Sequence, residues 1–112
     1  MQSFKAELFK ALGHPTRIRL LELLREGEKS VGEMQLALSA EGSTVSQQLA
    51  ILRMNNLVDT RKMGNATYYR IRDRQVNKLL DVARQIFDAH VIQLQAITGQ
   101  PEESSRAAAR SR

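Results

Sequence analysis

The sequence predicts a mainly α-helical domain that carries one small β-hairpin. Apolar residues recur every three or four positions over most of the 112 residues, and an extended pattern replaces this period only between positions 58 and 71. The first spacing is typical of amphipathic helices and the second of paired strands. A chain of this length forms one domain, predicted over residues 1–98 with about five helices, and residues 99–112 are predicted to be a disordered tail.

Capping signals delimit the first two helices. Ser3 is a candidate N-cap of the first helix, which is expected to end at Gly13. Pro15 suits the first position of the second helix, because the N–H that proline lacks would have no partner there. His14, immediately before it, can cap the same helix, and this structural role is favoured over a role as a metal ligand.

The next two helices are expected to be joined by a tight turn. Ser30 and Glu33 fit the capping box S-x-x-E, which opens a third helix that runs to about Leu38. A fourth helix is predicted over residues 43–55, with an apolar stripe at Val45, Leu49, Leu52 and the following Leu57. Its outer face carries hydroxyls, amides and a guanidinium, groups that reach phosphates and base edges. This outer face is assigned Ser43, Thr44, Ser46, Gln47, Gln48 and Arg53.

The extended stretch from 58 to 71 predicts the hairpin. Gly64 and Asn65 lie between two extended runs and are typical of a two-residue turn. Lys29 and Ser30 can pair as a further, very short strand. The order helix, turn, helix and basic hairpin is that of a winged helix-turn-helix, in which the hairpin lies along a phosphate backbone or enters a minor groove. Its candidate DNA-contacting residues are Arg61, Lys62 and Arg70.

A long final helix is predicted from Gln75 to Ile97. Its apolar stripe is longer than a domain of this size needs to cover its own core. The surplus, from Ile86 onward, is therefore expected to pack on a second chain.

Composition narrows the classes of function. The absence of cysteine excludes disulfides, zinc fingers, thiolate metal sites and cysteine catalysis. With only two, isolated histidines, no nucleophile–base pair or open metal site can be assembled, so an enzyme is not expected. The net charge of +5 favours nucleic acid or another anionic partner. No apolar run is long enough to cross a membrane and no signal-peptide core is visible, so the protein is expected to be cytoplasmic without a membrane partner.

Four stretches, LFKALGHPTRIRLLELL, VGEMQLAL, STVSQQLAILRMNNLV and YYRI, occur in this order between about Phe4 and Ile71. Together they resemble the ArsR/SmtB family of small bacterial repressors. The resemblance implies a winged helix-turn-helix that dimerises through its first and last helices and represses transcription at a palindromic operator. It also implies that a metal or an oxidant can release the DNA, as in many members. The residues expected at the dimer interface are Phe4, Leu8, Ile86, His90, Val91 and Leu94.

The resemblance implies that DNA is contacted by Ser43, Thr44, Ser46 and Gln47. This sequence departs from the family pattern at one of these residues and in the turn before the helix. Gln47 stands where a histidine is common in the family, and its amide can still pair with adenine. The segment Ala40 to Gly42 replaces the usual Leu-Ser-Gln, so the fourth helix is expected to lack an ordinary cap. This change also brings Glu41 near the phosphates unless its side chain turns away.

The effector sites of the family do not carry over whole. Ser30 and Gly32 stand where thiol-based members have Cys-x-Cys. Members that bind zinc, cobalt or nickel through the last helix use four positions, which here are Asp73, Gln75, Ile86 and Ala89. Only Asp73 matches the ligand found in those members.

Three hypotheses on function follow. The first is a homodimeric regulator, expected to be a repressor, that binds a palindromic duplex operator through helix 43–55 and the basic wing 58–71. The second is the same scaffold with a non-thiol metal switch for nickel or zinc, whose ligands would come from His90, His14 or Asp88 across the dimer; otherwise His90 is simply a packed interfacial histidine. The third is a winged-helix module that binds a protein rather than DNA.

Overall fold

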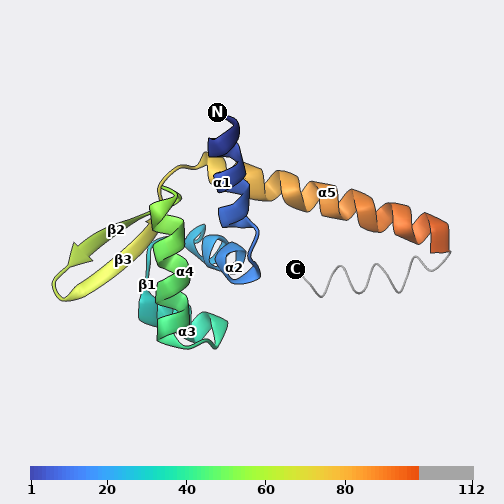
Figure 1. Ribbon diagram of the computed structural model, residues 1–112. Helices are drawn as coiled ribbons and strands as arrows, with labels where there is room; N and C mark the ends of the chain where they lie inside the picture. Colours follow the sequence, from blue (N-terminus) through green and yellow to red (C-terminus); the bar gives the residue numbers. More distant parts are fainter. Residues whose placement is uncertain (99–112) are drawn as a thin grey trace. The chain divides into compact units, whose positions relative to one another are not determined.

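The computed structural model describes residues 1–98, in which helices predominate and three short strands form one sheet (Figure 1). This result confirms the predicted mainly α-helical fold with a hairpin and the very short strand before the third helix. The elements in chain order are α1 (Gln2–Leu12), α2 (Pro15–Leu24), β1 (Lys29–Ser30), α3 (Val31–Leu38), α4 (Gly42–Met54), β2 (Val58–Met63), β3 (Ala66–Ile71) and α5 (Gln75–Thr98).

The described chain divides into two compact units, Met1–Val76 and the part of α5 from Asn77 onward. The domain predicted over residues 1–98 spans both units, and the predicted tail lies outside the described residues. Within residues 1–98, no helix is both long and apolar enough to span a membrane.

The core of the first unit is built from α2, α3, α4 and the base of the hairpin. All four apolar residues predicted for the stripe of α4 and its end are buried, which confirms the helical period. No polar or charged residue is buried within the described chain, so the core is apolar throughout. Its most deeply buried side chains are Leu20, Leu21, Met34, Val45, Leu49, Leu52 and Val58.

Two of the predicted helix caps are present. The Nδ1 atom of His14 accepts a hydrogen bond from the backbone N–H of Thr16 at 3.2 Å, so His14 caps α2. At the start of α3, the N–H of Ser30 donates to Glu33 at 2.9 Å and the N–H of Glu33 donates to the Ser30 hydroxyl at 3.2 Å. The first of these bonds lowers the pKa of Glu33, because it stabilises the carboxylate.

The cap predicted for α1 is wrong. The helix begins at Gln2 with Met1 at the N-cap position, so Ser3 lies inside the first turn. No side chain caps this end. The first-turn residues of α1 are exposed, where water can satisfy the free N–H groups.

The sheet has the antiparallel order β1-β3-β2. Met63 pairs with Ala66 across a two-residue turn, which confirms the predicted hairpin. Gly64 has φ +62°, a conformation that glycine adopts without the steric cost of a Cβ atom. In Figure 1 the hairpin extends away from α4 as a narrow arm.

The cap of α2 can be tested by substitution. His14→Ala should lower the free energy of unfolding by about 1 kcal/mol, because the N–H of Thr16 loses its acceptor. His14→Asn should keep most of the stability, since asparagine is a favourable N-cap residue. Urea denaturation at one fixed protein concentration measures both changes. Equal losses for the two variants would contradict a capping role.

Candidate nucleic-acid interface

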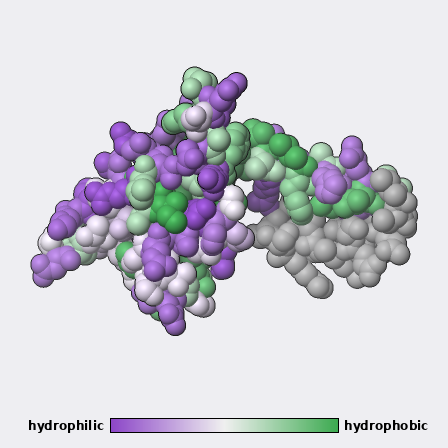
Figure 2. Space-filling model, in the orientation of Figure 1, coloured by the Kyte–Doolittle hydropathy of each residue, from purple (hydrophilic) through white to green (hydrophobic). Residues whose placement is uncertain are grey.

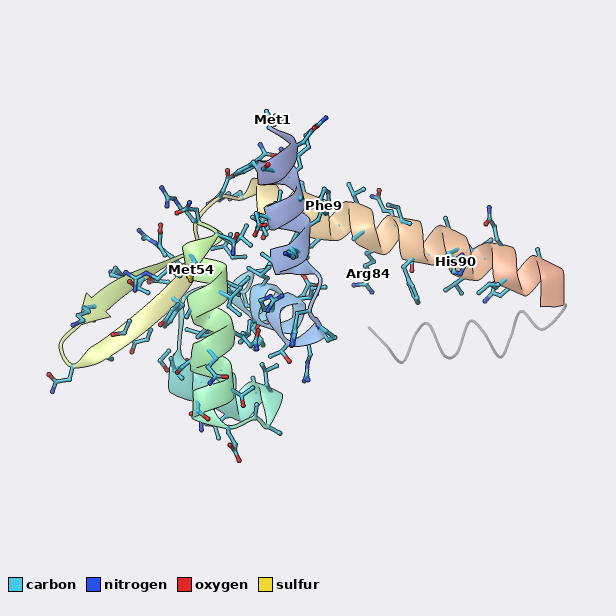
Figure 3. All side chains as sticks on the ribbon, viewed as in Figure 1. Met1, Phe9, Met54, Arg84 and His90 are labelled. Atoms are coloured by element: carbon cyan, nitrogen blue, oxygen red, sulfur yellow. The ribbon has the colours of Figure 1, made fainter. Side chains whose placement is uncertain are left out.

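The α4 helix is fixed by its apolar side and exposes a polar one. Val45, Leu49 and Leu52 have no exposed surface, so the helix cannot rotate about its axis without opening the core. The opposite side lies in solvent, with Met54 at its C-terminal end (Figure 3). Five of the six residues predicted for this outer face are exposed, and they are Ser43, Thr44, Ser46, Gln47 and Arg53.

The sixth residue, Gln48, was assigned to the outer face wrongly. Its Oε1 atom accepts a hydrogen bond from Nη1 of Arg17 at 2.8 Å, and the side chain is only half-exposed. The same guanidinium donates to the carbonyls of Ala11 at 2.6 Å and Lys10 at 3.1 Å. Arg17, which the sequence did not single out, therefore links the end of α1 to α4. Gln48 lies three residues after Val45 and four before Leu52, and this spacing along the buried stripe is the signal that could have suggested an inward-facing side chain.

The start of α4 lacks a side-chain cap, as expected from the unusual turn. Glu41 occupies the N-cap position, and its side chain makes no capping hydrogen bond. The side chain of Gln35 in α3 lies close to this turn, because a Cβ atom at Gly42 would be 2.9 Å from its Oε1 atom. The turn between α3 and α4 passes through Ser39, which takes a left-handed conformation with φ +51°. Because no side chain caps α4, the backbone N–H groups of its first turn remain available to an anion.

The basic residues of the hairpin do not share one face. Successive residues of a strand point to opposite sides of the sheet, so Arg61 and Lys62 lie on different faces. Arg70 shares the face of Arg61, because it pairs directly with Asp59 and side chains two apart lie on one side. Lys62 and Arg70 are exposed, and neither has an ion-pair partner within residues 1–98. Hydrophilic residues cover most of the hairpin in the view of Figure 2.

The Arg61 side chain is already bound to a carboxylate. Its Nε atom donates to Oε2 of Glu28 at 3.0 Å, and its Nη2 atom donates to Oε1 at 2.5 Å. This pair raises the pKa of Arg61, chiefly through the hydrogen bonds. Glu28 was not singled out from the sequence, since it lies 33 residues away and no local period connects the two.

The base of the hairpin is held to the end of α4 by a second arginine. Nη1 of Arg72 donates to Oδ1 of Asn56 at 2.9 Å, and the backbone N–H of Arg72 donates to the carbonyl of Leu57 at 3.1 Å. Asn56 has φ +60°, a conformation that asparagine tolerates better than most residues. These contacts set the direction in which the hairpin leaves α4.

The predicted metal ligands do not form a site within the described residues. His14 uses its Nδ1 atom to cap α2, and Asp73 accepts a hydrogen bond from the N–H of Gln75 at 2.9 Å, where α5 begins. His90 is exposed on α5 and Asp88 is half-exposed on the same helix (Figure 3). No three His, Asp or Glu side chains gather closely enough within residues 1–98 to hold a metal ion.

The residues predicted for the dimer interface include large exposed apolar side chains. Phe4 in α1 and Ile86 in α5 are each 66% exposed, and Leu94 is 43% exposed. Leu8 and Val91 are half-exposed, and His90 is exposed. Hydrophobic residues follow much of α5 in Figure 2. Further exposed apolar side chains on the two helices are Phe9, Val82, Phe87 and Ile92.

Comparison with known proteins defines the class of this protein. The family model described as "Bacterial regulatory protein, arsR family" matches residues 14–60. The HTH-type transcriptional regulator Rv0081 of Mycobacterium tuberculosis is 46% identical over 87 residues, which are 77% of this chain and 76% of that protein. The biofilm growth-associated repressor of Agrobacterium fabrum is 39% identical over 84 residues, 75% of this chain and 72% of that protein.

Two solved structures are similar in fold as well as in sequence. The crystal structure of Mycobacterium tuberculosis Rv0081 has a TM-score of 0.75 and 44% identity, and the match covers 85% of this chain and 95% of that one. A Mycobacterium bovis protein, described as a homodimeric winged helix-turn-helix DNA-binding domain, has a TM-score of 0.74 and 31% identity over 80% of this chain and 82% of that one. The protein is thus a winged helix-turn-helix transcriptional regulator and not an enzyme. It belongs to the ArsR family.

Proposed function

We propose that this protein is a homodimeric repressor that recognises a palindromic operator through the exposed side of α4 and the hairpin. The observation that carries the proposal is the polar, largely uncharged exposed side of α4, held in place by a fully buried apolar side. Hydroxyls and amides discriminate base edges in a major groove. Membership of the ArsR family favours this function over a winged-helix module that binds protein.

The hairpin supplies the sequence-independent part of the proposed contact. Lys62 and Arg70 are exposed and without an ion-pair partner in the described chain, so each can neutralise a phosphate. Phosphate contacts position a protein on the duplex, whereas base contacts distinguish one sequence from another. We therefore assign base recognition to α4 and backbone binding to the hairpin.

Dimerisation is supported by the apolar side chains that α1 and α5 leave exposed. Phe4 and Ile86 would each bury a large apolar surface against a second copy, which favours association. A similar protein from Mycobacterium bovis is described as homodimeric. A two-fold dimer presents two copies of α4, and this symmetry matches a palindromic operator.

The assignment of α4 predicts a sequence-specific loss of affinity. Gln47→Ala should cost roughly 1–3 kcal/mol of binding free energy for each half-site of the operator and little on random duplex, because an amide contact to a base is lost in each half-site. Footprinting on the DNA upstream of the protein's own gene provides the operator, and fluorescence anisotropy measures both affinities.

The matched control for this experiment lies on the hairpin. Lys62→Ala should weaken operator and random duplex alike and make the salt dependence of log affinity shallower by about 1.8 for the dimer, which is about 0.9 for the phosphate contact of each protomer. Equal losses on the two DNAs for Gln47→Ala would show that α4 does not contact the bases.

The proposed dimer predicts that Leu94→Glu yields monomers or misfolded protein, because it would bury an unpaired carboxylate in the interface. Gln93→Glu adds the same charge at the next position, which lies off the apolar stripe, and should stay dimeric. Multi-angle light scattering distinguishes these outcomes, and circular dichroism identifies misfolding. A native chain that remains monomeric at micromolar concentration would rule the dimer out.

A nickel or zinc switch stays a prediction, and the donor set within residues 1–98 does not fit a complete site. His14 caps α2 and Asp73 accepts a hydrogen bond at the start of α5, so His90 and Asp88 are the remaining candidates, with partner ligands from the second copy. Calorimetry with Ni²⁺ and Zn²⁺ should give a site that is lost in His90→Ala and kept in His14→Ala. Binding that is unchanged in both variants would place the ion elsewhere.

A further inference from the structure

The Glu28–Arg61 ion pair joins two edges of the sheet. β1 and β2 lie on opposite sides of β3, so the Arg61 side chain must cross the central strand to reach Glu28, just before β1. Tyr68 of β3 is the direct register partner of Arg61. Both carboxylate oxygens are used, one by Nε and the other by Nη2. The guanidinium edge formed by Nε and Nη2, which could otherwise hold an oxyanion in bidentate fashion, is therefore occupied by Glu28.

A DNA phosphate that approaches Arg61 through Nε and Nη2 would need the edge that Glu28 occupies. A guanidinium binds a carboxylate or a phosphate through two parallel N–H donors, so the two anions compete for this edge. The pair is open to this competition, because the side chains of Arg61 and Glu28 are 48% and 30% exposed. Exposed ion pairs contribute little to stability, so such an exchange is not prevented by the cost of breaking the pair.

We propose that Glu28 is a specificity-determining residue, which occupies the phosphate-binding position of Arg61 until a correctly docked duplex displaces it. The proposal rests on the proposed function, in which the hairpin binds DNA. Random duplex is held by phosphate contacts alone and gains little by displacing Glu28. An operator also engages α4, and this second attachment keeps a phosphate beside Arg61. Glu28 therefore lowers affinity for random DNA more than affinity for the operator.

A purely structural role for the pair predicts the opposite sign. If Glu28 only fastened β2 to β1, its removal would loosen the hairpin and weaken the binding of every duplex. If Glu28 competes with phosphate, its removal strengthens the binding of random duplex. The sign of the change in affinity thus separates the two roles.

The test measures the salt dependence of binding to random duplex for the native chain, Glu28→Gln, Arg61→Gln and the double variant. Glu28→Gln should bind random duplex more tightly, with a salt slope steeper by about 1.8 for the dimer, equivalent to one added phosphate contact in each protomer. The loss of slope caused by Arg61→Gln should be larger by about 1.8 in the Glu28→Gln background than in the native one. Operator affinity should change by less than the affinity for random duplex.

The matched control is Glu26→Gln, which removes the same charge two residues away. Glu26 pairs with Lys29 at 3.4 Å and makes no hydrogen bond or ion pair with Arg61. Its loss should leave the effect of Arg61→Gln on the slope as it is in the native chain. An equal change of that effect in the Glu26→Gln and Glu28→Gln backgrounds would overturn the proposal, because net charge would then explain it.

Two further results would overturn the role of Glu28 while leaving the proposed function intact. One is weaker binding of all duplexes by Glu28→Gln together with a lower melting temperature, which a fastening role predicts. The other result comes from NMR of the native chain, in which the resonance of the Arg61 side-chain N–H is followed as DNA is added. This resonance should shift with operator and not with random duplex, and equal shifts would overturn the proposal. A native chain that binds no duplex at low salt would instead refute the proposed function itself.

Discussion

The structure depends on the burial of one side of α4. Val45, Leu49 and Leu52 have no exposed surface and pack in a core without buried polar groups. Because close-packed side chains resist rotation of the helix, burial of these residues also decides which residues face solvent. The polar side that we assign to base recognition is thus a consequence of packing on the opposite side. A helix that was polar all round would have no fixed direction to present to a groove.

Arginines hold the remaining parts around this helix. Arg17 connects the final carbonyls of α1 to Gln48 of α4, and Arg72 connects the start of the segment after β3 to Asn56 at the end of α4. Each guanidinium has several donors in a rigid plane, so one side chain can set the relative position of two backbone segments. Arg61 is bound in the same way, but on a face where DNA phosphate is expected to compete.

The exposed apolar residues of α1 and α5 are apolar surface that the small core of a single chain does not bury. A chain of 112 residues buries a limited apolar surface by itself, and association adds to it. In the dimer that we propose, burial of Phe4 and Ile86 would connect stability to the two-fold symmetry that a palindromic site requires. The relatives of this ArsR-family protein are transcriptional regulators.

The sequence by itself determined most of the features that depend on residues within a turn or two of one another. The helical period of α4, the capping box that Ser30 opens and the turn at Gly64 are of this kind, because their physical causes lie within a few residues. Ser3 misled the prediction, since a hydroxyl near a chain end is a weak signal. Only the tertiary structure decided which polar side chains bind each other. Gln48 and Glu28 meet arginines 31 and 33 residues away, and no local period encodes a contact that folding alone brings together.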